Sequence, residues 1–167
     1  MVRQRNEPVG GLAAAEVRDE QVDVTFMVWL THRATSDLVD AALAPVGLDG
    51  DEFAIYSVLI ASSSITPTEL ARWMAASPTT VSSYVKRFEA RGHVRREPNP
   101  VDRRSYSIKL TPAGRRTYRA AAALFLPLRT RVADALGARE DGVRESLIAL
   151  RTVLDELRHT PAEPTDS

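Results

Sequence analysis

Residues 77–111 constrain the fold of this chain more than any other stretch. Ser77 can accept hydrogen bonds from the first free backbone N–H groups of a helix, and Pro78 suits the first helical position, where its missing N–H is no loss. Apolar side chains then recur four and three residues apart, at Val81, Val85 and Phe88. This spacing places them on one buried side of the helix. Gly92 supplies the left-handed conformation that ends a helix.

Two short alternating segments follow Gly92, at residues 94–97 and 105–110. Alternation of apolar and polar side chains is typical of strands, and the residues between them, 99–104, combine turn-forming Asn99 and Pro100 with two arginines. The sequence therefore predicts a β-hairpin with a basic tip directly after the helix.

A second helix is predicted immediately before Ser77. Thr66, Pro67 and Glu69 have the form of a capping box with proline at the first helical position. The residues expected to face inward from it are Leu70, Ala71 and Met74. Joined across residues 75–76, the two helices form a helix-turn-helix, and the hairpin completes a winged helix. In such a unit the second helix can enter a major groove and the wing can reach an adjacent groove or the backbone.

The motifs of the chain follow one another in a characteristic order. They are Asp49…Glu52-Phe53, Thr68-Glu69-Leu70-Ala71, Ser77-Pro78-Thr79-Thr80-Val81, Arg91-Gly92 and Asp102-x-Arg104-x5-Leu110-Thr111. In this order they resemble the MarR family of bacterial transcriptional regulators, over about residues 22–157. The resemblance implies a mainly α fold with a small β-wing, a homodimer, and double-stranded DNA as the partner. It also implies a small aromatic or anionic effector, because MarR-like dimers commonly bind one between the dimerising helices and the winged domain.

Charge is unevenly distributed along the chain. The 22 basic and 22 acidic residues cancel, which taken alone argues against a nucleic-acid partner. Between residues 70 and 119, however, twelve basic residues stand against three acidic ones. A basic block within an otherwise acidic molecule is typical of a phosphate-binding surface.

The chain divides into four kinds of segment. Residues 1–17 are predicted to be a flexible arm and residues 159–167 a flexible tail. The MarR-like domain at 18–158 comprises a DNA-binding winged helix at about 48–111 and dimerisation helices at about 18–46 and 112–158. The dimerisation helices carry more apolar surface than a small winged domain can cover, which favours a homodimer.

Several local features of these helices are also predicted. Asp49 and Glu52 look like a capping box, and Asp49, Asp51 and Glu52 are adequately explained as helix-start charges. Ile65 is expected to pair with the hairpin as a short strand. Pro127 should kink or break the helix of residues 112–136 near Leu124. The last helix has a coiled-coil-like seam at Val143, Leu147, Leu150, Leu154 and Leu157.

Seven residues of the helix that starts at Ser77 are candidate DNA contacts. They are Ser77, Thr79, Thr80, Ser82, Ser83, Lys86 and Arg87. The hydroxyls and Lys86 can donate to base edges, whereas Arg87 and the N–H groups of the helix start suit phosphates. A Ser/Thr-rich helix side is by itself equally compatible with simple solvation, and the neighbouring wing and cap signals favour DNA.

Arg103 and Arg104 at the wing tip are expected to approach the minor groove. In the family's wing pattern the arginine matching Arg104 is inserted, and the aspartate matching Asp102 holds it by an ion pair. The chain departs from the family pattern at Ala75, Ser83, Tyr84 and Phe88. Base preference therefore cannot be carried over from relatives.

The resemblance also suggests residues for an effector site. Trp29, His32, Arg33 and Tyr56 could supply a stacking wall and a cation for a carboxylate or phenolate. Large aromatic residues at helical spacing are, however, more often core or dimer packing than part of a ligand site.

Other functional classes find little support in the sequence. The absence of cysteine excludes disulfides, thiolate metal sites and thiol redox sensing. His32, His93 and His159 lack metal-ligand spacing, so we expect no metal, and no cofactor is indicated. Neither a nucleophile motif, a phosphate-binding glycine loop nor paired catalytic carboxylates occur, so no enzymatic activity is expected. Short apolar runs and the lack of a signal peptide predict a cytoplasmic protein without membrane contact.

The sequence thus predicts a sequence-specific transcriptional regulator, a repressor that occupies a pseudo-palindromic operator as a homodimer. An effector would act by changing the distance between the two recognition helices. The alternative is a winged-helix module whose basic surface binds an acidic partner protein.

Overall fold

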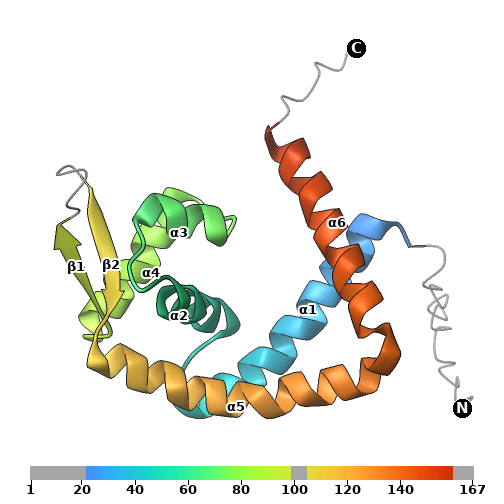
Figure 1. The fold of residues 1–167 in the computed structure, drawn as a ribbon, viewed down its shortest axis with the longest axis horizontal. Helices are drawn as coiled ribbons and strands as arrows, with labels where there is room; N and C mark the ends of the chain where they lie inside the picture. The colour runs from blue at the N-terminus through green and yellow to red at the C-terminus, as the bar shows by residue number, and fades with distance from the viewer. Residues whose placement is uncertain (1–21, 99–104, 160–167) are drawn as a thin grey trace, which may run out of the picture. The chain divides into compact units, whose positions relative to one another are not determined.

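The structure is a computed structural model that describes residues 22–98 and 105–159 (Figure 1). The chain separates between Asp37 and Leu38 into two compact units. None of the helices in these described ranges is long and apolar enough to cross a bilayer.

The first unit contributes the N-terminal part of α1 (Val24–Leu43), a helix within the predicted range 18–46. Asp23 caps this helix, because its Oδ1 accepts hydrogen bonds from the backbone N–H groups of Thr25 and Phe26, at 2.9 and 3.1 Å. The rings of Phe26 and Trp29 stack with their centroids 5.6 Å apart, and both side chains are about half exposed. An apolar pair therefore lies on the surface of this unit.

The second unit begins with the end of α1, a 3-10 turn at Ala44–Val46, and α2 (Gly50–Ser62). Gly47 takes the left-handed conformation at φ 66°, as expected where the first helix stops. α3 (Pro67–Trp73) starts with the predicted capping box, in which Thr66 and Glu69 bond each other's backbone N–H groups. The local signals for these helices are confirmed.

The winged helix forms as predicted. Ser77 caps α4 (Pro78–Ala90), and Gly92 at φ 67° follows its end. β1 (Val94–Pro98) and β2 (Tyr106–Leu110) pair antiparallel, with Val94 opposite Leu110. The predicted pairing of Ile65 is confirmed as a bridge to Ile108. Three residues of the wing tip, Asp102, Arg103 and Arg104, lie outside the described residues.

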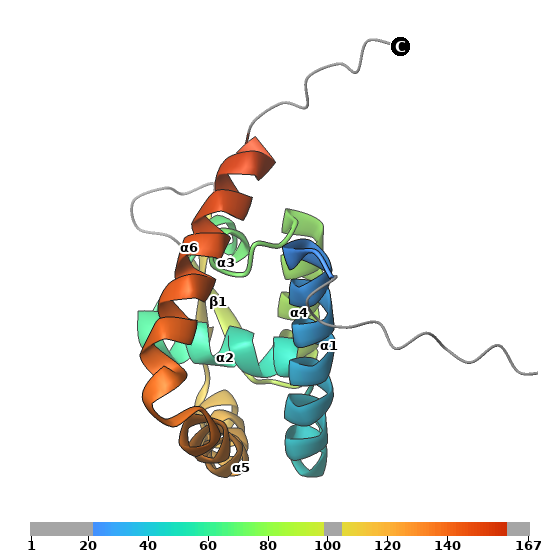
Figure 2. The same cartoon turned by 90° about the vertical axis from the view of Figure 1, so that its right-hand side faces the viewer.

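The core of this unit lies between α2, α3, α4, the hairpin and the start of α5 (Pro112–Leu136). The predicted inner side of α4 is confirmed, because three of its side chains are at most 1% exposed: Val81, Val85 and Phe88. α2 crosses α5, which Figure 2 shows nearly along its axis. Phe53 of α2 packs against Phe125 of α5, with ring centroids 5.0 Å apart.

Pro127 does not break α5. The helix runs without interruption from Pro112 to Leu136, so of the predicted kink or break near Leu124 the break is wrong, and Figure 1 shows one curved helix. A proline removes one backbone hydrogen bond, and bending relieves the clash of its ring with the preceding turn while the other bonds persist.

The last helix, α6 (Glu140–His159), follows a 3-10 turn at Gly137–Arg139. The predicted seam lies on its surface, and four of the five seam residues are between 37 and 63% exposed: Val143, Leu147, Leu154 and Leu157. α6 therefore presents an apolar stripe that the described chain leaves in contact with solvent.

Candidate nucleic-acid interface

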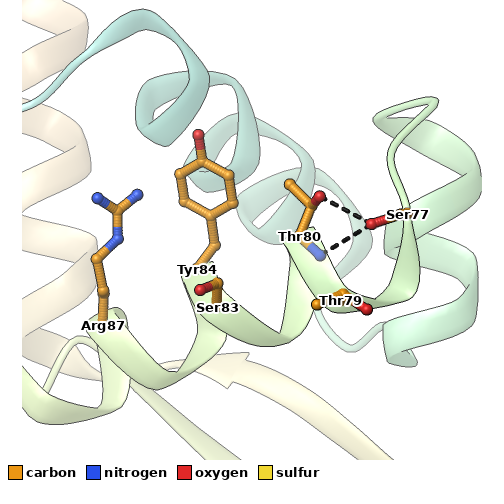
Figure 3. A pocket seen from close by; sticks show the side chains of 6 residues that line it. All are labelled: Ser77, Thr79, Thr80, Ser83, Tyr84 and Arg87. Carbon is orange, nitrogen blue, oxygen red and sulfur yellow. Dashed lines mark hydrogen bonds between the residues drawn. The ribbon is translucent and has the colours of Figure 1, made fainter.

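The outer side of α4 carries a shallow hollow of about 490 Å³ (Figure 3). Six side chains line it, namely Ser77, Thr79, Thr80, Ser83, Tyr84 and Arg87. We call this surface the α4 hollow. It brings together five of the seven candidate DNA contacts on this helix, whereas Lys86 is exposed beside it and Ser82 is half-buried.

The start of α4 is held by its own hydroxyls. Ser77 Oγ accepts a hydrogen bond from the backbone N–H of Thr80 at 3.1 Å, and the two hydroxyls lie 2.8 Å apart (Figure 3). Ser77 therefore serves first as the helix cap. The exposed N-terminus of α4 keeps backbone N–H groups and a positive dipole end near the hollow, an arrangement that suits a phosphate.

Tyr84 also lines the hollow, although it is not among the DNA contacts predicted from the sequence. Its hydroxyl donates to Asp51 Oδ2 at 3.0 Å, and the Arg87 guanidinium carbon lies 4.5 Å from the centroid of its ring. Helical spacing could have indicated it, because Tyr84 lies four residues after Thr80 and three before Arg87. The bond to Asp51 joins α4 to the first turn of α2.

Glu52 has a different role from the one predicted. The first half of the capping box forms, since Asp49 Oδ1 accepts from the backbone N–H of Glu52 at 2.7 Å. The Glu52 side chain is instead 3% exposed, and Arg91 Nη1 donates to both of its oxygens at 3.1 Å. Arg87 Nη2 lies 3.4 Å from the same carboxylate. A buried carboxylate requires such partners, so Glu52 turns toward α4 and not toward its own helix start.

Tyr56 belongs to the core. It is fully buried, and its hydroxyl lies 2.6 Å from His93 Nδ1. Burial raises the pKa of Tyr56 to about 12 and lowers the pKa of His93, because a low-dielectric surrounding disfavours both charged forms. Every buried polar side-chain atom in the described residues has a hydrogen-bond partner. This placement agrees with the core alternative for Tyr56.

The wing strands add cations next to α4, most of them paired. Glu97 binds Arg95 at 2.7 Å and Lys109 at 2.6 Å, and the hydrogen bond from Lys109 is the main reason that the pKa of Glu97 is lowered. Arg96 donates to Glu89 at 2.7 Å. The three cations of the described wing strands thus all have an acidic partner, although two of them share Glu97, and the two arginines predicted to reach DNA belong to the wing tip.

The remaining candidates for an effector site lie on the first unit. Trp29, His32 and Arg33 are exposed on α1, and the Arg33 guanidinium carbon lies 5.9 Å from the centroid of the Trp29 ring. Among the described residues no three His, Asp or Glu side chains gather in a way that could hold a metal.

Known proteins resemble this chain in sequence. Residues 46–105 match the model of the MarR family. The multiple antibiotic resistance protein MarR of Salmonella typhimurium is 22% identical over 102 residues, which cover 61% of this chain and 71% of that protein. An HTH-type transcriptional repressor of Mycobacterium tuberculosis is 34% identical over 77 residues, covering 46% of this chain and 55% of that one.

Solved structures resemble this chain in fold. A mutant of Escherichia coli MarR complexed with operator DNA superposes with a TM-score of 0.71 at 23% identity, over 84% of this chain and 99% of that one. The Mycobacterium tuberculosis regulator MosR in complex with DNA gives a TM-score of 0.73 at 24% identity, over 82% of this chain and 99% of that one. At these identities the likeness establishes the winged-helix fold.

Proposed function

We propose that this chain, whose residues 46–105 match the model of the MarR family of transcriptional regulators, is a repressor that binds a pseudo-palindromic operator as a homodimer. The observation that carries the proposal is the α4 hollow, in which hydroxyls, a guanidinium and a helix N-terminus share one exposed surface. Such donors can reach base edges and phosphates in a major groove. Repression would follow from occupation of promoter DNA.

The exposed apolar residues of α5 and α6 support the homodimer. Leu126 and Val132 of α5 are about half exposed, as is Leu147 of the α6 seam. A second copy can cover a self-complementary apolar stripe through a two-fold axis. Two α4 helices would then lie about one DNA turn, roughly 34 Å, apart.

For the wing we propose the roles that the family pattern implies. Arg103 and Arg104 enter or approach the minor groove, and Asp102 orients Arg104.

We further propose that an aromatic or anionic effector binds on α1. Trp29 offers a ring face, Arg33 a cation beside it, and His32 a further nitrogen donor or acceptor. Salicylate as the probe should quench Trp29 fluorescence in a Trp73→Phe variant and should fail to do so after Arg33→Ala. Quenching that survives Arg33→Ala would contradict this site.

The function is tested by selecting random duplexes on the purified protein and measuring binding at two salt concentrations. We expect an enriched palindrome, steep salt dependence, and a large loss of affinity in Arg104→Ala but not in the control Arg144→Ala on α6. Equal, weak binding of every duplex would overturn the regulator. It would favour the other candidate, a module whose basic surface binds an acidic protein.

A further inference from the structure

Two adjacent carboxylates at the start of α2 each bind one side chain of the α4 hollow. Asp51 Oδ2 accepts the hydroxyl of Tyr84 at 3.0 Å. Glu52 Oε1 lies 3.4 Å from Arg87 Nη2. Figure 3 shows Tyr84 and Arg87 side by side along the helix, one turn apart. The first turn of α2 therefore contacts the hollow at two consecutive positions.

Tyr84 and Arg87 also contact each other. The guanidinium carbon lies 4.5 Å from the ring centroid, within the range of a cation–π interaction. The Arg87 side chain is 49% exposed, so one side of the guanidinium is packed and the other faces solvent. A long side chain that is already ordered loses less conformational entropy when it binds a partner. We call this pair the Tyr84–Arg87 stack.

The charges around Glu52 leave Arg87 able to bind an anion. Arg91 donates to both carboxylate oxygens at 3.1 Å, whereas Arg87 approaches only one of them and at the longer distance of 3.4 Å. One negative charge thus faces two guanidinium groups. Arg87 is the more exposed of the two, with a side-chain exposure of 49% against 39% for Arg91, so it is the one that an anion can reach more easily.

We propose that Asp51 and Glu52 are positioning residues for DNA binding, which hold the Tyr84–Arg87 stack in the orientation in which Arg87 binds a backbone phosphate. This inference rests on the proposed function. It assigns to two acidic residues a favourable role in binding an anionic ligand. Charge alone predicts the opposite, because removing a carboxylate should strengthen attraction to DNA.

The first test asks whether removal of the Glu52 carboxylate weakens or strengthens DNA binding. Binding of the selected duplex is measured for the full chain with Glu52→Gln, Arg87→Gln and both. Glu52→Gln should weaken binding by about threefold to tenfold, because Arg87 loses the charged partner that orients it. It should also make the plot of log affinity against log salt concentration less steep, by about one unit of slope. Arg87→Gln should do the same, because it removes the phosphate contact itself. The double variant should bind no more weakly than Arg87→Gln, because the two changes remove one contact.

A purely structural role of Glu52 gives a different pattern. The salt slope of Glu52→Gln would then equal that of the wild type, and the two losses of affinity would multiply. Either result, or tighter binding by Glu52→Gln, overturns the inference. Asp141→Asn is the matched control, because it removes a carboxylate that binds Arg144 on α6, and its affinity and salt slope should be unchanged.

If Glu52→Gln fails to fold, variants of Asp51 and Tyr84 test the same inference. Asp51 is exposed, and Tyr84→Phe keeps the ring and removes only its hydroxyl. Asp51→Asn and Tyr84→Phe should each weaken binding by about threefold, with no further loss when combined. Unchanged or tighter binding by Asp51→Asn overturns the inference while leaving the regulator intact. A wild-type protein that prefers no duplex instead overturns the proposed function itself.

Discussion

The hydroxyl of Tyr56 lies 2.6 Å from Nδ1 of His93, a contact between residues that stand 37 positions apart. Because burial raises the pKa of Tyr56 to about 12, the phenol stays protonated and donates. Because burial also lowers the pKa of His93, the imidazole stays neutral and Nδ1 accepts. His93 Nε2 lies 3.5 Å from Thr117 Oγ1, so the pair extends from α2 to α5.

This pair makes stability depend on pH. The ordinary pKa of the His93 side chain is 6.5, and the folded value lies below it. Below the ordinary value the unfolded chain therefore binds more protons than the folded one, and the free energy of unfolding falls as the pH drops further. Urea unfolding at about pH 7.5 and about pH 5.5 should show this loss. In His93→Gln the difference should shrink, and an undiminished difference would place its origin elsewhere.

Arg91 should matter more for stability than an exposed arginine of equal charge. Arg91→Ala leaves the carboxylate of Glu52, which is 2% exposed, without its two-oxygen partner and should cost about 1–3 kcal/mol of unfolding free energy. Arg144→Ala removes an exposed pair with Asp141 and should cost less than about 1 kcal/mol. Chemical denaturation of both variants measures the difference, and equal effects would contradict the buried pair.

Gly114 should not tolerate a methyl group. A Cβ at this position would overlap the backbone oxygen of His93, in the close contact between the first turn of α5 and the turn after α4. Gly114→Ala should therefore lower the free energy of unfolding by about 1–3 kcal/mol, as overpacking does.

Gly142 provides the matched control within a helix. A Cβ there would meet nothing within 4 Å. Gly142→Ala should raise stability by roughly 0.5–1 kcal/mol, because alanine favours a helix more than glycine does. Thermal melting of the two glycine variants should give shifts of opposite sign. A stable Gly114→Ala protein would show that the α5 start can move away from His93.

Replacing Ala75 by glycine should stabilise the protein. It adopts φ 48° in the turn between α3 and α4, a left-handed conformation that costs a residue with a Cβ about 1–2 kcal/mol. Ala75→Gly should relieve this strain and raise the melting temperature. Ala76→Gly, at the next position and without a positive φ, should lower it. The same sign for both variants would contradict strain at Ala75.

The α6 stripe should control assembly. Leu147→Glu places a charge on the exposed apolar seam and should convert the proposed dimer to monomers, as measured by analytical ultracentrifugation. Thr152→Glu puts the same charge elsewhere on α6, where the Thr152 hydroxyl bonds only its own helix, and should leave the dimer intact. If Leu147→Glu leaves the sedimentation unchanged, α6 is not the interface.

Local sequence signals were sufficient for the helices, the hairpin and most of the α4 hollow. Caps such as Ser77, Thr66 and Asp49 act within three residues, and glycine stops and apolar periodicity act within one or two turns. For that reason the inner side of α4 and the antiparallel wing could be predicted without knowing the fold. Even the five hollow residues that the sequence indicated follow from one helix and its spacing.

Only the tertiary structure decided which distant side chains meet. Glu52 carries a local cap signal in its backbone N–H, yet its carboxylate binds Arg91, 39 residues away. Asp51 and Tyr84 are 33 residues apart and meet because α2 lies against α4. Pro127 leaves α5 unbroken because neighbouring hydrogen bonds persist around it. Burial and ion pairing depend on how helices pack, and packing is a property of the whole chain, whereas caps and periods belong to a few consecutive residues.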